Sequence, residues 1–315
     1  MTAPSSPSAP SAPLISRPRA RRSRRAGHAY LLVLPYALLL LVVGILPAIY
    51  ALLTSFFDLD KAGAPFRGLF HYQTAFSDFR FAAATGHVFA FLGLWLPAML
   101  IGVPAIALLL HVRPSRFTEA MRLIYYLPSA VTGSASVLVW IFMFTPQLSP
   151  FGPLLKLLGF SSVSSVLAAP NLPLAFAIMA FVAYSGYWVV VVYGALQGIS
   201  KEVLEAATVD GCTAWQLALQ IKLPLVTRYL ILMLILSFAG GFQLFVEPQV
   251  IYSASLNSLS NPAWSLSQLA YNFAFQMANF SASAALSVGL LVVSLSVALV
   301  VIYRTDFYRT DGGEA

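Results

Sequence analysis

The feature that most constrains this chain is a series of six apolar segments, each long enough to cross a lipid bilayer as a helix. A helix rises about 1.5 Å per residue, so about 20 residues cross the roughly 30 Å of bilayer hydrocarbon. Because lipid offers no partner to open backbone groups, every spanning segment of this kind must be helical. The segments run from about 29–53, 87–111, 122–145, 172–196, 228–252 and 281–303. The sequence therefore predicts an all-α polytopic membrane protein with six transmembrane helices.

Composition excludes an ordinary soluble domain. Of the 315 residues, 59% are hydrophobic and 9% are charged, whereas soluble domains carry about 25% charged residues. The net charge of +7 comes largely from six arginines between positions 17 and 25, which favours a basic segment beside the membrane over a nucleic-acid-binding arm. The single cysteine, Cys212, excludes an intrachain disulfide. The first apolar segment is longer than the roughly 7–15 residues of a signal-peptide core, so we expect it to be retained.

The positions of lysine and arginine predict the orientation of the chain. With the N-terminus inside, fourteen of the eighteen such residues fall in inner segments, and only Lys61, Arg67, Arg80 and Lys156 fall outside. Cytoplasmic loops carry such an excess, so both termini are predicted to be cytoplasmic. We expect three regions, which are a disordered Pro/Ser-rich and then Arg-rich tail over 1–28, a transmembrane domain over 29–303, and a cytoplasmic tail over 304–315.

A polar block over 201–224 separates the fourth and fifth apolar segments and lies on the cytoplasmic side in this topology. Its pattern predicts two short amphipathic helices, over 201–208 and 214–222, joined by a turn at Gly211. Pro224 is expected to end the second helix and to lead into the fifth apolar segment. The block carries three acidic side chains, which are Glu202, Glu205 and Asp210. Since the inner leaflet is anionic, these acids favour a protein partner over a lipid surface.

The same block resembles the EAA motif of permease subunits of binding-protein-dependent ABC importers. That motif reads EAA, three residues, Gly, nine residues, Ile, one residue and Leu-Pro, and its fixed positions match Glu205, Ala206, Ala207, Gly211, Ile221, Leu223 and Pro224. "ALQGISKEVLEAATVDG", "SFAGGFQLFVEP" and "FSASAALSV" are similar to stretches of the carbohydrate group, the maltose- and glycerol-phosphate-type sugar permeases. Two departures are Ser200, where the family usually has proline, and "SLNSLSNPAW", where a glycine-rich "TGGGP" commonly follows the fifth span.

The resemblance implies the permease subunit of an ABC importer, a multi-pass protein of a prokaryotic inner or plasma membrane. It implies that the block is a coupling-helix hairpin that docks on a separate ATPase, with Glu205 facing a basic residue and Gly211 forming the turn. The implied coupling residues are Glu205, Ala206, Ala207, Asp210, Gly211, Ile221, Leu223 and Pro224. A rigid helix wedged in a moving cleft acts as a lever, which agrees with this role.

The implied partners are a second permease subunit in a heterodimer, two ABC ATPase subunits and an extracytoplasmic solute-binding protein, besides membrane lipid. The chain itself is expected to be no enzyme and to bind no cofactor, because ATP and Mg would be used by the partner ATPase. It contains no G-x-x-x-x-G-K-[ST] loop to hold ATP phosphates, and its four histidines show no metal-ligand spacing.

Polar and aromatic residues inside the fourth and fifth apolar segments are candidates for a substrate pathway. They are Tyr184, Tyr187, Trp188, Ser237, Gly241, Gln243 and Glu247. The equivalent stretches line the sugar site in maltose-type permeases. Helix packing is an equal alternative, because small residues and aromatics also gather at helix interfaces. Glu247 is interpreted as a gate or interface residue.

Two rival functions can be weighed from the sequence. An ion-coupled secondary transporter needs intramembrane charged groups, for which Glu247 is the only candidate, and it would not need the polar block. An intramembrane enzyme lacks its groups, because neither H-E-x-x-H nor G-x-S-x-G occurs. The sugar or sugar derivative stays open, and so does the subunit that holds it.

Overall fold

The computed structural model describes residues 32–58, 63, 65–112, 115–131, 133–254 and 263–305. The expected tail over 1–28, residues 29–31 of the first apolar segment and residues 306–315 lie outside the described residues. The chain divides into two compact units, 1–50 and 51–315, which are described separately. Among the described residues the regular structure is helical, apart from one isolated β-bridge between Phe57 and Phe66.

The first unit holds most of one apolar helix, Leu32–Phe56. It contains a π-helical stretch, η1 (Leu40–Ile45), which continues into α2 (Leu46–Phe56). The helix carries no charged side chain, so its character fits a membrane span.

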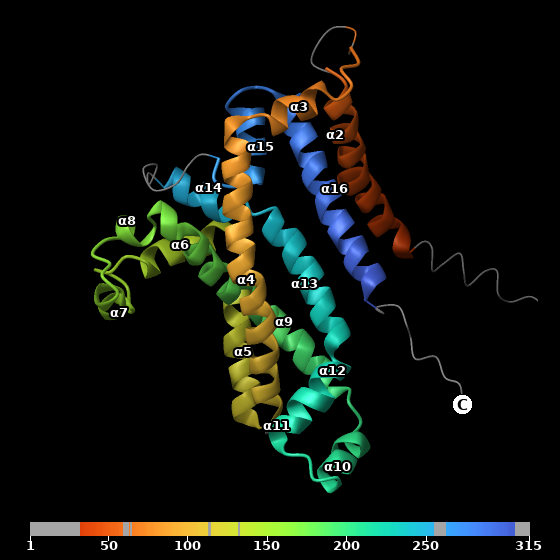
Figure 1. The fold of residues 1–315 in the computed structure, drawn as a ribbon, viewed down its shortest axis with the longest axis vertical. Helices are drawn as coiled ribbons and strands as arrows, with labels where there is room; N and C mark the ends of the chain where they lie inside the picture. The colour runs from red at the N-terminus through yellow and green to blue at the C-terminus, as the bar shows by residue number, and fades with distance from the viewer. Residues whose placement is uncertain are drawn as a thin grey trace, which may run out of the picture. The chain divides into compact units, whose positions relative to one another are not determined.

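The second unit holds the remaining helices, coloured from orange to blue in Figure 1. They are α3 (Phe70–Phe76), α4 (Phe79–Val112), α5 (Arg116–Ala130), α6 (Gly133–Met143), α7 (Gly152–Leu157), α8 (Val163–Val166), η2 (Ala169–Asn171), α9 (Leu172–Gln197), α10 (Lys201–Val209), α11 (Ala214–Gln216), η3 (Leu217–Lys222), α12 (Leu223–Leu225), α13 (Thr227–Phe242), α14 (Val246–Ser253), α15 (Leu266–Phe275) and α16 (Phe280–Arg304).

Within the described residues, five helical stretches are long and apolar enough to span a membrane. They are Leu32–Phe56, Phe79–Val112, Ala169–Gln197, Thr227–Ser253 and Phe280–Arg304. A sixth exists only if α5 and α6 cross together as one broken segment, because they meet at 106°. The all-α, multi-pass class is therefore confirmed with five or six candidate spans, and the segment predicted over 122–145 is divided between α5 and α6.

The break between α5 and α6 has a local cause. Pro128 lies in the last turn of α5, and Val131 is in an extended conformation. Gly133 begins α6 with a φ of 67°, which L side chains rarely adopt. Proline and glycine at these two positions are compatible with a break, but they do not fix the angle between the two helices.

The core of the second unit is formed where α9 packs along α4 and α5, with α13 against α4. Phe91 and Met99 of α4, Phe176 and Leu196 of α9, and Met233 of α13 are fully buried. In a bilayer, lipid is as apolar as these side chains, so close packing rather than release of water holds such helices together.

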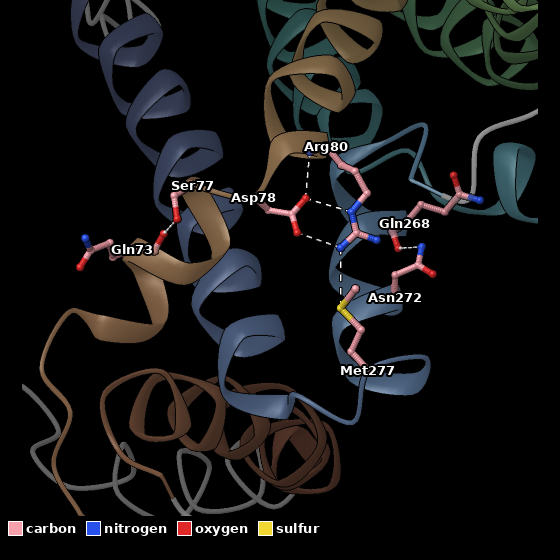
Figure 2. Close-up of polar contacts among 7 residues, drawn as sticks. All are labelled: Gln73, Ser77, Asp78, Arg80, Gln268, Asn272 and Met277. Carbon is pink, nitrogen blue, oxygen red and sulfur yellow. Dashed lines mark hydrogen bonds and ion pairs between the residues drawn. The ribbon is translucent and has the colours of Figure 1, made fainter.

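A polar network ties the first turn of α4 to α15, as Figure 2 shows. The carboxylate of Asp78 accepts hydrogen bonds from Nε and Nη2 of Arg80 at 2.9 and 2.8 Å. The guanidinium of Arg80 also lies over the ring of Phe273, 5.6 Å from its centroid, and 3.7 Å from Sδ of Met277. The hydrogen bonds from Arg80 hold the pKa of Asp78 below its usual value. This network fixes α15, a buried helix that the sequence pattern did not indicate.

The backbones of α5 and α9 approach closely at Gly186, where a Cβ atom would collide with the carbonyl oxygen of Tyr125. Backbone atoms cannot give way as a side chain can, so we expect Gly186→Ala to destabilise the protein by about 1–3 kcal/mol through overpacking. Thermal unfolding in detergent measures the loss. Gly194→Ala in the same helix is the control, because no atom lies within 4 Å of its Cβ position. Equal melting temperatures for both variants would contradict this packing.

Candidate functional site

The first candidate site is the hairpin formed by α10 and the helix over 214–225. Gly211 joins the two arms with a φ of 84°, so the predicted turn is present. The N–H of Cys212 donates to the carbonyl oxygen of Ala207 at 3.0 Å and closes the end of α10. Thr213 caps the second arm, because its hydroxyl accepts from the N–H of Gln216 while the Gln216 side chain accepts from the N–H of Thr213.

The second arm runs further than the sequence pattern predicted. We expected Pro224 to end the helix near Lys222, but the arm continues through η3 and α12 to Leu225. In η3 the N–H of Leu223 donates to the carbonyl oxygen of Ala218, five residues earlier. This wider π-helical turn relieves the clash between a proline ring and the preceding turn.

The free surface of the hairpin combines acidic and apolar side chains. Glu205 is exposed on α10. Val209 and Trp215 expose 87% and 72% of their surface. Ala207 is buried and packs the arm. An acidic group beside exposed apolar side chains suits a basic partner surface rather than water.

The base of the hairpin is tied to the apolar helices through Lys222. Its side chain is 8% exposed, and Nζ lies 3.0 Å from Nδ1 of His111 at the end of α4. Burial lowers the pKa of Lys222. The His111 ring contacts Tyr193 of α9, and the guanidinium of Arg122 of α5 lies 4.2 Å from the centroid of the Tyr193 ring. η3, α4, α5 and α9 therefore meet at the base of the hairpin.

The second candidate site is a cavity of about 240 Å³ between α4, α9, α13 and α14. Aromatic rings line one side, where Trp95 lies 5.8 Å from Tyr184 and 5.3 Å from Phe91 between ring centroids. Residues with polar side chains also line it from α13 and from the segment between α13 and α14. The lining residues that carry polar groups are Trp95, Tyr184, Trp188, Ser237, Gln243 and Glu247.

A second cavity of about 210 Å³ adjoins the first and lies between α5, α6, α9 and α14. Tyr126, Ser129, Ser136 and Tyr187 supply its polar side chains, besides two residues that also line the first cavity. The two shared residues are Tyr184 and Glu247. They therefore stand at the junction of the two spaces.

Several polar atoms at these cavities have no hydrogen-bond partner within the described part of the chain. They are Nε1 of Trp95, Oγ of Ser237 and Oγ of Ser129. Trp95 is 3% exposed and Ser237 is 4% exposed, so bulk water does not readily satisfy them. Buried polar groups are usually paired, so these three atoms, which are shielded from solvent, are exceptions in the packing of the cavity walls.

All seven predicted pathway residues line one or both cavities, including Gly241, whose missing side chain leaves room for Trp95. Whether they contact a substrate stays a prediction. The sequence interpretation missed Phe91 and Trp95 of α4. A tryptophan in the middle of a span, rather than at the bilayer surface, was the available signal.

Metal binding finds no support in the described ranges, where no group of three or more His, Cys, Asp or Glu side chains could hold an ion. His87 instead stacks on Trp264 at 5.2 Å between ring centroids.

Comparison with known proteins gives concordant results. Residues 74–305 match the family described as "Binding-protein-dependent transport system inner membrane component". The chain is 24% identical over 282 residues to the arabinooligosaccharides transport system permease protein AraP of Halalkalibacterium halodurans, covering 89% of this chain and 88% of AraP. It is 27% identical to the trehalose/maltose transport system permease protein MalF of Thermococcus litoralis, and the match covers 91% of this chain and 96% of MalF. It also shares the fold of a chain in the crystal structure of a bacterial alginate ABC transporter in complex with alginate pentasaccharide-bound periplasmic protein. The TM-score is 0.70 at 20% identity, and the match covers 89% of this chain and 94% of that chain.

The wall of the first cavity supplies a test of its geometry. A Cβ atom on Gly241 would lie 2.5 Å from Cζ3 of Trp95 and 2.7 Å from Cδ2 of Leu92. Trp95 borders the first cavity, so we expect Gly241→Ala to push the indole into that space at a smaller stability loss than Gly186→Ala.

Tryptophan emission and the melting temperature in detergent measure the two effects. Gly240→Ala is the matched control, because its Cβ position has no atom within 4 Å. An unchanged emission spectrum for Gly241→Ala would show that Trp95 does not border Gly241 in this way.

Proposed function

Because the chain belongs to the family of binding-protein-dependent transport system inner membrane components, and is thus a multi-pass ABC importer permease of a prokaryotic plasma membrane, we propose that it translocates a carbohydrate. The carbohydrate is delivered by an extracytoplasmic solute-binding protein. The observation that carries the cargo class is the cavity lined by both aromatic and polar side chains.

The lining of the two cavities suits a saccharide. Sugar rings have apolar faces that stack on aromatic side chains such as Trp95 and Trp188, and hydroxyl groups that need fixed donors and acceptors. Ser237, Gln243 and Glu247 supply such groups. Together the cavities reach the roughly 300–1,000 Å³ common for ligand pockets. The names of two relatives, which refer to arabinooligosaccharides and to trehalose and maltose, support the same class.

We assign the energy source to separate subunits. In this proposal the hairpin docks on one of two ABC ATPase subunits, which use ATP and Mg²⁺, and Glu205 faces a basic residue there. The chain catalyses no reaction itself, and a second permease subunit completes the pathway in a heterodimer. Exposure of Glu205, Val209 and Trp215 supports a docked partner, and the Lys222–His111 contact supports transmission to the spans.

The topology belongs to the same proposal. The α5–α6 pair counts as the third of six crossings, and both termini are cytoplasmic. The bias of lysine and arginine supports this orientation. An ion-coupled secondary transporter, the rival function, is not favoured, because the family couples transport to a binding protein.

Reversal of the charge at Glu205 tests the docking site. Loss of one partner from a buried charge pair costs about 2–5 kcal/mol, and a lysine adds like-charge repulsion. We expect Glu205→Lys to remain in the membrane but to lose co-purification of the ATPase and uptake in vesicles. Glu119→Lys, with the same charge change in the first turn of α5, is the control. Normal recruitment and uptake with Glu205→Lys would refute the docking role of the hairpin.

Reporter fusions test the topology. A fluorescent protein that matures only in the cytoplasm, fused after Ala315, should be bright, whereas alkaline phosphatase at the same place should be inactive. The same pair of reporters fused after Ser161, in the segment that follows α6, should give the opposite pattern. Active phosphatase at the C-terminus would overturn the proposed orientation.

A further inference from the structure

The two cavities share one charged side chain, the carboxylate of Glu247. Every other side chain that lines them is apolar or uncharged, and no lysine, arginine or histidine is among these described lining residues. Glu247 lies in the first turn of α14, where free backbone N–H groups favour a negative charge. The charge at the lining of the two cavities is therefore negative, and no positive side chain among the described lining residues balances it.

We propose that Glu247 is a charge-selecting residue, so that the cavities admit uncharged or cationic saccharides and exclude anionic ones such as uronates and sugar phosphates. This inference deepens the proposed function and rests on it, because it specifies which carbohydrates pass. An anionic group would meet a carboxylate that no basic side chain among the described lining residues balances, and like charges repel.

The position of Glu247 makes this selection hard to avoid. Glu247 and Tyr184 line both cavities, so a ligand in either one lies beside the carboxylate. Tyr184 in turn contacts Trp95, with ring centroids 5.8 Å apart. A bound ring that stacks on Trp95 therefore lies near the charge.

The other polar groups fit a neutral or cationic ligand equally well. Tyr184, Trp188 and Gln243 line the first cavity and carry O–H or N–H donors, and the amide of Gln243 also accepts hydrogen bonds. Glu247 accepts hydrogen bonds, either from sugar hydroxyls or from an ammonium group. A carboxylate or phosphate on the ligand would have the indole and hydroxyl donors but no positive charge to balance it.

Cysteine labelling tests the inference without knowledge of the transported sugar. Gln243 lines the first cavity and is exposed to it, and Cys212 is the only native cysteine. The complete transporter, purified through a tag on this chain, carries Cys212→Ser and Gln243→Cys. It is treated with two methanethiosulfonate reagents of similar size, one bearing a trimethylammonium group and the other a sulfonate.

The measured quantity is the ratio of the two labelling rates, divided by the same ratio for free cysteine. A nearby carboxylate changes thiol ionisation equally for both reagents, so this normalised ratio reports the local potential alone. We expect the cationic reagent to be favoured on the order of tenfold, the lower end of the effect of charged clefts on local ion concentration.

Three variants identify the source of the preference. Glu247→Gln should bring the normalised ratio close to one, and Glu247→Asp should keep most of the preference. Glu119→Gln, which removes an exposed carboxylate on α5, should leave it unchanged. Gel filtration establishes that each variant is folded, and Glu247→Asp keeps the test valid if Glu247→Gln is unstable.

Two results would overturn the inference. One is a normalised ratio close to one in the protein with Glu247 intact. The other is no reaction of Gln243→Cys with either reagent, because charge selection by Glu247 requires a cavity that water reaches. If the transporter takes up carbohydrate but the normalised ratio is close to one, the charge selection is refuted and the proposed function stands. A high ratio without any carbohydrate uptake would do the reverse.

Discussion

The interruption between α13 and α14 is the constraint on which the site depends. In lipid, every backbone N–H and C=O group needs a partner, so a helix is interrupted only where protein or a cavity satisfies the freed groups. Here the N–H groups of Gln243 and Leu244 donate to the carbonyl oxygens of Gly240 and Gly241 at 3.2 Å. The interruption tightens the end of α13, turns the chain and places Glu247 at the start of α14, beside the cavity. The polar pathway residues follow from this one local change of direction.

Close backbone packing gives the cavity its fixed walls. Gly241 allows Trp95 and Leu92 to lie against α13, and Gly186 allows α9 to approach the backbone of Tyr125 in α5. Helices in a bilayer gain little from burying apolar surface, so small residues that permit close contact determine which helices pair. The same helices extend toward the hairpin, where Lys222 and His111 join its base to α4. The hairpin and the cavity are therefore both attached to one connected set of packed helices.

Much of the site could be predicted from residue types. Side chains that carry polar groups are costly inside apolar segments unless they have a role. Six such residues were predicted together with Gly241, and all seven line the cavities. Trp95 and Phe91 were missed, because aromatic residues in an apolar helix look like packing. The turn at Gly211 was visible in the sequence, but the continuation of the second arm past Pro224 was not. It depends on a π-helical turn that accommodates the ring, and residue preferences do not encode such a change of hydrogen bonding.

The sequence by itself determined the membrane class, the approximate spans and the family motif, because each depends on local composition or fixed spacing. Length and apolarity suffice to specify a span, since the thickness of hydrocarbon is the same for every helix. Only the tertiary structure decided that α5 and α6 meet at 106°, that α15 is buried, and that Glu247 borders two cavities. These features depend on which helices approach one another, and contacts such as that between Arg80 and Met277 join residues distant in the chain. No local pattern carries that information, because packing depends on the shapes of both surfaces together.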